Sequence, residues 1–193
     1  MHRDYSQRIA GRVAQVKPEE LGTSKRREDI RIRKMAGEVA TEVHRMKAFV
    51  RLSSLGLLVF YGFLKPRHRI GQHICDYFAR RDPGIIVALG NGRESWISLC
   101  RNGCLIRGKG EGLQETLGSL KSALANVDGW QDSAGTEHEK VDRLWQAYYD
   151  SQYCPERKNL EAFRRRMPRR DQESAGMRLV QKEGNASLDD FFL

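Results

Sequence analysis

The clearest pattern along this chain is a stripe of apolar side chains at helical spacing. Between residues 32 and 46 they recur every three or four positions, at Ile32, Met35, Val39, Val43 and Met46. This spacing places them on one face of a helix and leaves charged residues on the other face. Ser24, followed by an acidic pair at residues 28 and 29, is typical of a helix start. The pattern therefore predicts a long helix that opens near Ser24.

Strand patterns follow this helix. Residues 49–52 and 57–64 are rich in β-branched and aromatic side chains, and the polar stretch 53–56 between them indicates a hairpin. Pro66 suits the first turn of a second helix, which ends at Pro83 and Gly84. Further strands are predicted at 85–89, 94–101 and 104–107.

Asn102 and Gly103 predict a two-residue turn of type I′ between the last two of these strands. The turn pairs Arg101 with Cys104, so alternate residues of both strands share a face. One face is apolar and consists of Ile97, Leu99, Cys104 and Ile106, and the other consists of Trp96, Ser98, Cys100, Leu105 and Arg107. Cys100 and Cys104 have a tolerable ligand spacing, but they point to opposite faces, so we expect no metal site and no cofactor.

Three more helical segments are predicted, at 113–124, 139–151 and about 160–168. The fold class is therefore α+β: a small, mostly antiparallel sheet with an inserted helix, flanked by N- and C-terminal helices. We expect an N-terminal extension at 1–24 and the α+β domain at 25–170. A disordered C-terminal tail is expected at 171–193, because its first part is too polar to build a core.

Charge narrows the classes of partner. The 193 residues include 34 Lys and Arg against 25 Asp and Glu, and the net charge of +9 favours a polyanionic partner. The chain has no run of eighteen apolar residues and opens without an apolar signal core, so we expect neither membrane insertion nor secretion. Four cysteines at irregular spacing suit a reducing cytosol. The expected location is cytoplasmic and nucleoid-associated.

Basic residues gather in clusters that suit contacts with phosphates. The residues predicted to bind nucleic acid are Arg45, Lys47, Arg51, Arg67, His68, Arg80, Arg81, Arg164, Arg165 and Arg169. Three aromatic residues near them, Tyr61, Trp96 and Tyr149, could stack on bases. The alternative is that the aromatic residues belong to the core and that the arginines are merely solvated.

Groups suited to general acid–base catalysis are also present. They are His44, His68 and His73, with Glu42, Asp76 and Glu94 as potential partners. Such groups must lie within hydrogen-bond reach of one another in a cleft. Because the sequence has no nucleophile motif and no phosphate-binding loop, we expect that the chain is not an enzyme on its own.

The last nine residues, 185–193, follow a polar stretch and contain two adjacent phenylalanines. A single helical turn would place Leu188, Phe191 and Phe192 on one side. This spacing resembles the PIP box, the peptide by which replication and repair proteins dock on the PCNA sliding clamp, although Asn185 stands where glutamine is usual. The resemblance implies that these four residues bind a PCNA-type clamp, in an archaeal-type setting. The alternative is that the three apolar residues fold back onto the protein's own core.

A second resemblance covers residues 25–170. It rests on six segments that follow one another along the sequence: Glu42–Arg51, Pro66–His68, Phe78–Arg81, Leu144–Ser151, Pro155–Leu160 and Met167–Pro168. This succession resembles domain of unknown function 4130, whose members are often labelled DNA-metabolism proteins and occur alone, beside radical-SAM proteins or joined to uracil-DNA glycosylase domains. The resemblance implies a DNA-repair setting and makes those two kinds of protein candidate partners. It assigns no reaction and no catalytic residues.

Together these patterns predict a DNA-binding accessory protein in DNA repair and replication, tethered to a PCNA-type sliding clamp by its C-terminal peptide. Two alternatives stay open at this point. One is an enzyme that acts on damaged or modified DNA bases, and the other is an RNA-binding protein of the translation apparatus.

Overall fold

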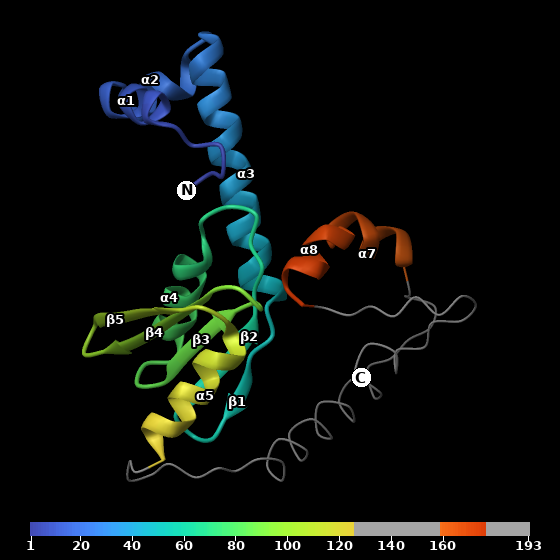
Figure 1. The fold of residues 1–193 in the computed structure, drawn as a ribbon. Coiled ribbons are helices and arrows are strands. Elements are labelled where there is room, and N and C mark those ends of the chain that lie inside the picture. Colours follow the sequence, from blue (N-terminus) through green and yellow to red (C-terminus); the bar gives the residue numbers. More distant parts are fainter. Residues whose placement is uncertain (126–158, 177–193) are drawn as a thin grey trace.

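The fold is organised around a five-stranded sheet in a computed structural model that describes residues 1–125 and 159–176 (Figure 1). The strands lie in chain order: β1 (Ser53–Leu55), β2 (Val59–Phe63), β3 (Ile86–Gly90), β4 (Ser95–Arg101) and β5 (Cys104–Gly110). β2 and β3 are parallel, and the other neighbouring pairs are antiparallel. Helix α4 (Gly71–Arg81) makes the crossover that parallel strands require. The predicted α+β class, with a mostly antiparallel sheet and an inserted helix, is confirmed.

The other described helices lie around the sheet and beyond it. They are α1 (Gln7–Gln15), α2 (Pro18–Thr23), α3 (Arg27–Phe49), α5 (Leu113–Leu124), α7 (Leu160–Arg166) and α8 (Arg169–Ser174). One end of α3 lies beside α4 and α8, and α1 and α2 lie at its far end (Figure 1). The stripe predicted on α3 is confirmed, because Ile32, Met35 and Met46 are buried. Across residues 1–125 and 159–176, no helix is both long and apolar enough to cross a membrane.

Helices cover both faces of the sheet. The main core lies between the sheet and α4, where Ile74 and Phe78 pack with Leu89 and Trp96. On the opposite face, α5 places Leu113 and Leu117 over Ala88, in a second and smaller core. The long helix α3 joins the main core through Met46.

The predicted register of the last hairpin is confirmed. Arg101 pairs with Cys104, and both Asn102 and Gly103 have the positive φ angles of a type I′ turn. The buried face is the one that carries Trp96 and Cys100, because α4 packs against it. Ile106 lies on the more uniformly apolar face and is 60 % exposed. Tertiary packing, and not the apolar character of the strand face, thus decides which side is buried.

Several predicted boundaries are wrong. The hairpin is displaced, because α3 continues through Phe49 and β1 occupies the stretch predicted as the turn. Helix α4 begins at Gly71 rather than at Pro66, since residues 64–70 form a loop. Strand β5 continues to Gly110, through part of the segment predicted as a flexible link.

Both ends of the predicted domain are extended by ordered segments. The N-terminal extension contains α1 and α2, and Arg12 donates two hydrogen bonds of 2.9 Å to Asp29 on α3. At the other end, α8 occupies the start of the predicted disordered tail, and its Asp171 is buried. Residues 171–174 therefore belong to a helix and not to a disordered segment. Residues 177–193 lie outside the described part of the chain.

Candidate functional site

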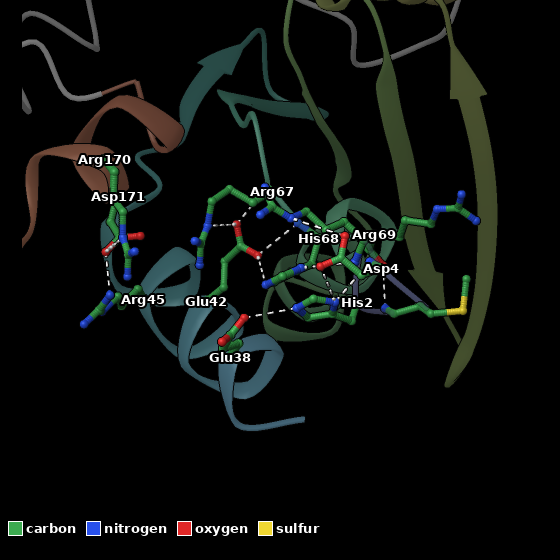
Figure 2. A network of polar contacts seen from close by, with 12 residues as sticks. His2, Asp4, Glu38, Glu42, Arg45, Arg67, His68, Arg69, Arg170 and Asp171 are labelled. Carbon is green, nitrogen blue, oxygen red and sulfur yellow. Dashed lines mark hydrogen bonds and ion pairs between the residues drawn. The ribbon is translucent and has the colours of Figure 1, made fainter. Parts of the chain in front are cut away.

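Three segments that are distant in the sequence meet beside the middle of α3 (Figure 2). They are the first residues of the chain, α3 itself and the loop that precedes α4. The amino group of Met1 donates a hydrogen bond of 3.0 Å to the carbonyl of Arg69, and the Arg69 amide donates to the Met1 carbonyl at 2.9 Å. This pair fixes the amino terminus against the loop and brings polar side chains from all three segments together.

Glu42 is the buried anchor of the loop. Its carboxylate is 1 % exposed and accepts the amide hydrogens of Arg67 at 2.7 Å and His68 at 3.1 Å. Burial of a carboxylate is costly unless hydrogen bonds replace its water. Here the loop amides, which have no strand or helix partner, supply those bonds. This explains why residues 64–70 remain a loop instead of joining α4.

His68 is held between Glu42 and the amino terminus. Its Nδ1 accepts the amide hydrogen of Arg3 at 3.3 Å, which places the ring proton on Nε2. That Nε2 lies 3.8 Å from a Glu42 oxygen, beyond hydrogen-bond range, and has no hydrogen-bond partner among the described residues. Burial lowers the pKa of His68, so its imidazole is neutral at neutral pH.

His2 lies against His68, with the ring centroids 4.2 Å apart. Its Nδ1 accepts the Asp4 amide hydrogen at 3.0 Å, and its Nε2 donates to Glu38 at 3.1 Å. This hydrogen bond holds the pKa of the Glu38 carboxyl below its usual value. His2 is buried, whereas Glu38 is partly exposed. The cluster therefore has a buried side at His2 and a side at Glu38 that is open to water.

Four residues predicted to bind nucleic acid are occupied by contacts within the protein. Arg45 donates a hydrogen bond of 2.6 Å to buried Asp171, and the Lys47 ammonium lies 4.4 Å from the Tyr77 ring centroid. Arg67 is half-buried beside Glu42, and His68 is only 3 % exposed. The prediction is wrong for His68, because a buried ring cannot reach a phosphate.

The other six predicted residues are exposed. Arg51 follows α3, and Arg80 and Arg81 end α4, with Arg81 paired to Asp82 at 3.0 Å. The remaining three lie on α7 and α8, as Arg164, Arg165 and Arg169. These positions therefore belong to separate segments of the fold.

Within residues 1–125 and 159–176, the densest basic surface is formed by α7 and α8. Five exposed arginines lie within seven residues of each other, at positions 164, 165, 166, 169 and 170. Next to them, a groove of about 500 Å³ runs between α3 and α7. Its lining includes His44, Arg45, Phe49, Arg166 and Met167. The arrangement combines cationic groups at the rim with apolar atoms inside the groove.

The two predicted stacking aromatics that the structure describes, Tyr61 and Trp96, are not available on this surface. Trp96 is buried in the main core, and Tyr61 packs beneath α5. The expectation that Trp96 stacks on bases is therefore wrong. Tyr149 lies outside the described residues, as do all four residues of the predicted clamp-binding peptide.

The acid–base candidates divide into separate environments. Only His68 and Glu42 come together in the cluster of Figure 2, whereas His44, His73 and Glu94 are exposed. Asp76 accepts hydrogen bonds from buried Ser98 at 2.6 Å and from partly exposed Arg107 at 3.0 Å, in a network between α4 and the sheet. These contacts leave Asp76 a structural role.

Sequence reasoning missed His2 and Glu38. A signal for Glu38 existed, since Glu38 and Glu42 are four residues apart and therefore lie on one helix face. No comparable signal pointed to His2, because its neighbours in space come from residues 38 and 68.

Comparison with known proteins gives one match. Residues 5–173 match the model of a family described as a domain of unknown function, DUF4130. No curated protein and no solved structure matches the chain.

Proposed function

Because this chain belongs to the DUF4130 family, a domain of unknown function, we propose a function from its surface: it binds DNA as an accessory protein in repair and replication. The observation that supports this most is the arginine surface of α7 and α8 beside the groove of α3. Arginine offers several donors in a planar fork that matches phosphate oxygens. A net charge of +9 adds a long-range attraction for any polyanion.

The ion pairs on this surface are compatible with binding. Arg165 pairs with Glu161 and Arg169 with Glu173, both at 3.1 Å and both between exposed side chains. Exposed pairs at this helical spacing contribute only about 0.3–0.5 kcal/mol. A phosphate can therefore replace the glutamate at little cost. Arg45 differs, because its partner Asp171 is buried, so we assign it to the fold and not to the DNA contact.

The test is the salt dependence of DNA binding. If about five phosphates are neutralised, the logarithm of affinity should fall against the logarithm of salt with a slope of roughly −4 to −5. Changing Arg164, Arg165 and Arg166 together to Gln should make this slope shallower by about 2 to 3. The readout is fluorescence anisotropy of a labelled duplex titrated with the full chain.

A matched variant removes the same charge elsewhere. Arg27, Arg31 and Lys34 are exposed at the far end of α3, and changing all three to Gln should alter the slope much less. An equal decrease of the salt slope in the two triple variants would show that net charge alone drives binding. It would refute the assignment of DNA binding to the α7–α8 surface. Recovery of RNA but not DNA with the protein from cell extract would favour the RNA-binding alternative.

The proposal includes a tether to a PCNA-type sliding clamp through the peptide 185–193. Its basis is the spacing of Leu188, Phe191 and Phe192 in the sequence. A second attachment point would raise the local concentration of a weak DNA-binding domain without any new contact to DNA. This part of the proposal is independent of the arginine surface, because it involves a different segment of the chain.

A further inference from the structure

We propose that His2, Glu38 and His68 form a site for one divalent transition-metal ion of the zinc class. Their ligand atoms all lie within 4.8 Å of one another. Figure 2 shows the three side chains converging from the amino terminus, α3 and the loop before α4. Two imidazoles and one carboxylate are a donor set found at zinc and at non-haem iron(II) sites. The site does not depend on the proposed binding of DNA.

The Nε2 atom of His68 is the independent observation that points to a ligand. His68 is 3 % exposed, and this nitrogen has no hydrogen-bond partner among the described residues. Buried polar side-chain atoms nearly always have a partner, because an unpaired one loses its interaction with water. A metal ion held between His68, His2 and Glu38 would give this nitrogen the partner that it lacks.

One pair of ligand atoms already has the separation that a small cation needs. Tetrahedral bonds of 2.0–2.1 Å place ligand atoms roughly 3.3 Å apart. The His2 Nε2 and Glu38 Oε2 atoms already lie 3.1 Å apart. The other separations are at most 4.8 Å, and the Glu38 side chain is 42 % exposed, so it can move toward His68. The same exposure provides an entry path for the ion.

Metal binding requires both imidazoles to carry their proton on Nδ1. For His2, the Asp4 amide that now donates to Nδ1 at 3.0 Å must turn away, and the Asp4 carboxylate, 3.7 Å from Nδ1, can then accept that proton in a hydrogen bond. Carboxylates in this position orient metal-binding histidines and raise their basicity. For His68, the Arg3 amide must move away, and its present hydrogen bond of 3.3 Å is long. Both changes require movement of residues 3 and 4 only, and the side chains of Arg3 and Asp4 are exposed.

Glu42 is a positioning residue in this scheme. Its oxygens accept the amides of Arg67 and His68, which fixes the direction of the His68 ring. Three protein ligands then leave one coordination position for water on the Glu38 side. Zinc sites with three protein ligands and one water are the catalytic type, whereas structural sites use four protein ligands.

The experiment uses the full chain without an affinity tag, stripped with a chelator and titrated with zinc by calorimetry. We expect one equivalent to bind and to raise the melting temperature. Cobalt in place of zinc should give the visible absorption of a low-symmetry site. His2→Ala and Glu38→Gln should each weaken zinc binding at least tenfold and remove the shift in melting temperature. His44→Ala is the matched control, because His44 is an exposed histidine on the same helix, outside the cluster.

His68→Ala alters a buried residue and is therefore informative only when circular dichroism shows a folded protein. Glu38→Gln avoids this problem, since its side chain is partly in solvent. The absence of stoichiometric zinc would overturn the proposal. Equal zinc affinity in wild type, His2→Ala and Glu38→Gln would also overturn it, because the ion would then be bound by other residues.

Discussion

The guanidinium of Arg45 donates a hydrogen bond of 2.6 Å to the carboxylate of Asp171, although 126 residues separate them in the chain. The pair joins α3 to α8, and the carboxylate is 2 % exposed. Arg170 adds a second positive charge 3.8 Å from the same oxygen. α8 is therefore held to α3 by a specific polar contact, and the arginine surface has a fixed place on the domain.

The first prediction concerns this ion pair. Asp171→Ala removes the acceptor and leaves Arg45 without its buried partner, which is costly when a charge is partly desolvated. We expect a loss of about 2 kcal/mol in the free energy of unfolding, less than the roughly 3–5 kcal/mol of a fully buried pair, because Arg45 is 23 % exposed. Urea unfolding followed by circular dichroism measures it. Glu173→Ala is the control, since its exposed pair with Arg169 should contribute almost nothing.

A second prediction tests the packing of Trp96 against the start of α4. Gly71 is the first residue of α4, and a Cβ atom there would lie 2.3 Å from the Trp96 ring. Gly71→Ala should therefore force the indole or the helix to move, at a cost of about 1–3 kcal/mol. The comparison is Gly37→Ala in the middle of α3, where no described atom lies within 4 Å of the new methyl group.

The two glycine variants should change stability in opposite directions. Gly37→Ala should raise the free energy of unfolding by about 0.5–1 kcal/mol, because alanine favours an exposed helix interior. Thermal unfolding of both proteins provides the readout. A neutral Gly71→Ala variant would mean that Trp96 does not pack on the start of α4.

The third prediction is a pH dependence that arises from Asp76. Burial raises the pKa of this carboxyl, but the hydrogen bonds from Arg107, Ser98 and Gln72 outweigh burial and hold it below its usual value. A carboxyl whose folded pKa is lowered stabilises the fold above its unfolded pKa and loses that contribution as the pH falls through the folded value. The Asp76 contribution should thus be complete near neutrality and decline below about pH 4.

Asp76→Asn makes this contribution measurable. The difference in unfolding free energy between wild type and variant should be constant from neutrality to about pH 5 and should shrink at lower pH. Other carboxyls titrate in both proteins, so their effect cancels in the difference. A difference that is the same at neutrality and in acid would contradict the assignment of Asp76 as an ionised partner of Arg107.

The parts of the fold that sequence predicted well are those governed by local chemistry. The Asn102-Gly103 turn dictated its own register, and the stripe on α3 marked its buried face. The errors arose where a distant residue decides the local structure. Glu42 binds the amides of residues 67 and 68 and so delays the start of α4, and Arg45 binds Asp171 and so orders α8.

The same distinction applies to the candidate sites. Charge clusters are visible in a sequence, but whether Arg45 or His68 is free to bind a ligand depends on partners that lie 126 and 26 residues away. His2 could not be assigned from sequence at all, because its contacts with Glu38 and His68 are formed only in the fold. The sequence therefore identified histidines and carboxylates as candidate groups, but it did not predict that His2, Glu38 and His68 come together.

The last prediction concerns the tether. In complex with a PCNA-type clamp, Leu188, Phe191 and Phe192 should occupy one apolar pocket, and the free energy of binding should be near −8 kcal/mol, a micromolar affinity. Truncation of a buried aromatic anchor costs about 2 kcal/mol. Phe191→Ala or Phe192→Ala should therefore weaken clamp binding by roughly thirtyfold. Asn185→Gln should bind as tightly or more tightly, because glutamine reaches further toward the polar anchor position of the motif.

Asp189→Ala is the matched control for the two phenylalanine variants, since an aspartate outside the apolar side of the turn should contribute little. Calorimetric titration against the clamp and melting temperatures should be measured on the same preparations. If the peptide instead folds back onto the domain, the pattern inverts: the phenylalanine variants lower the melting temperature and leave clamp binding unchanged. Because each arrangement predicts a loss in one measurement and no change in the other, the paired experiment separates them even if the DNA-binding surface is assigned wrongly.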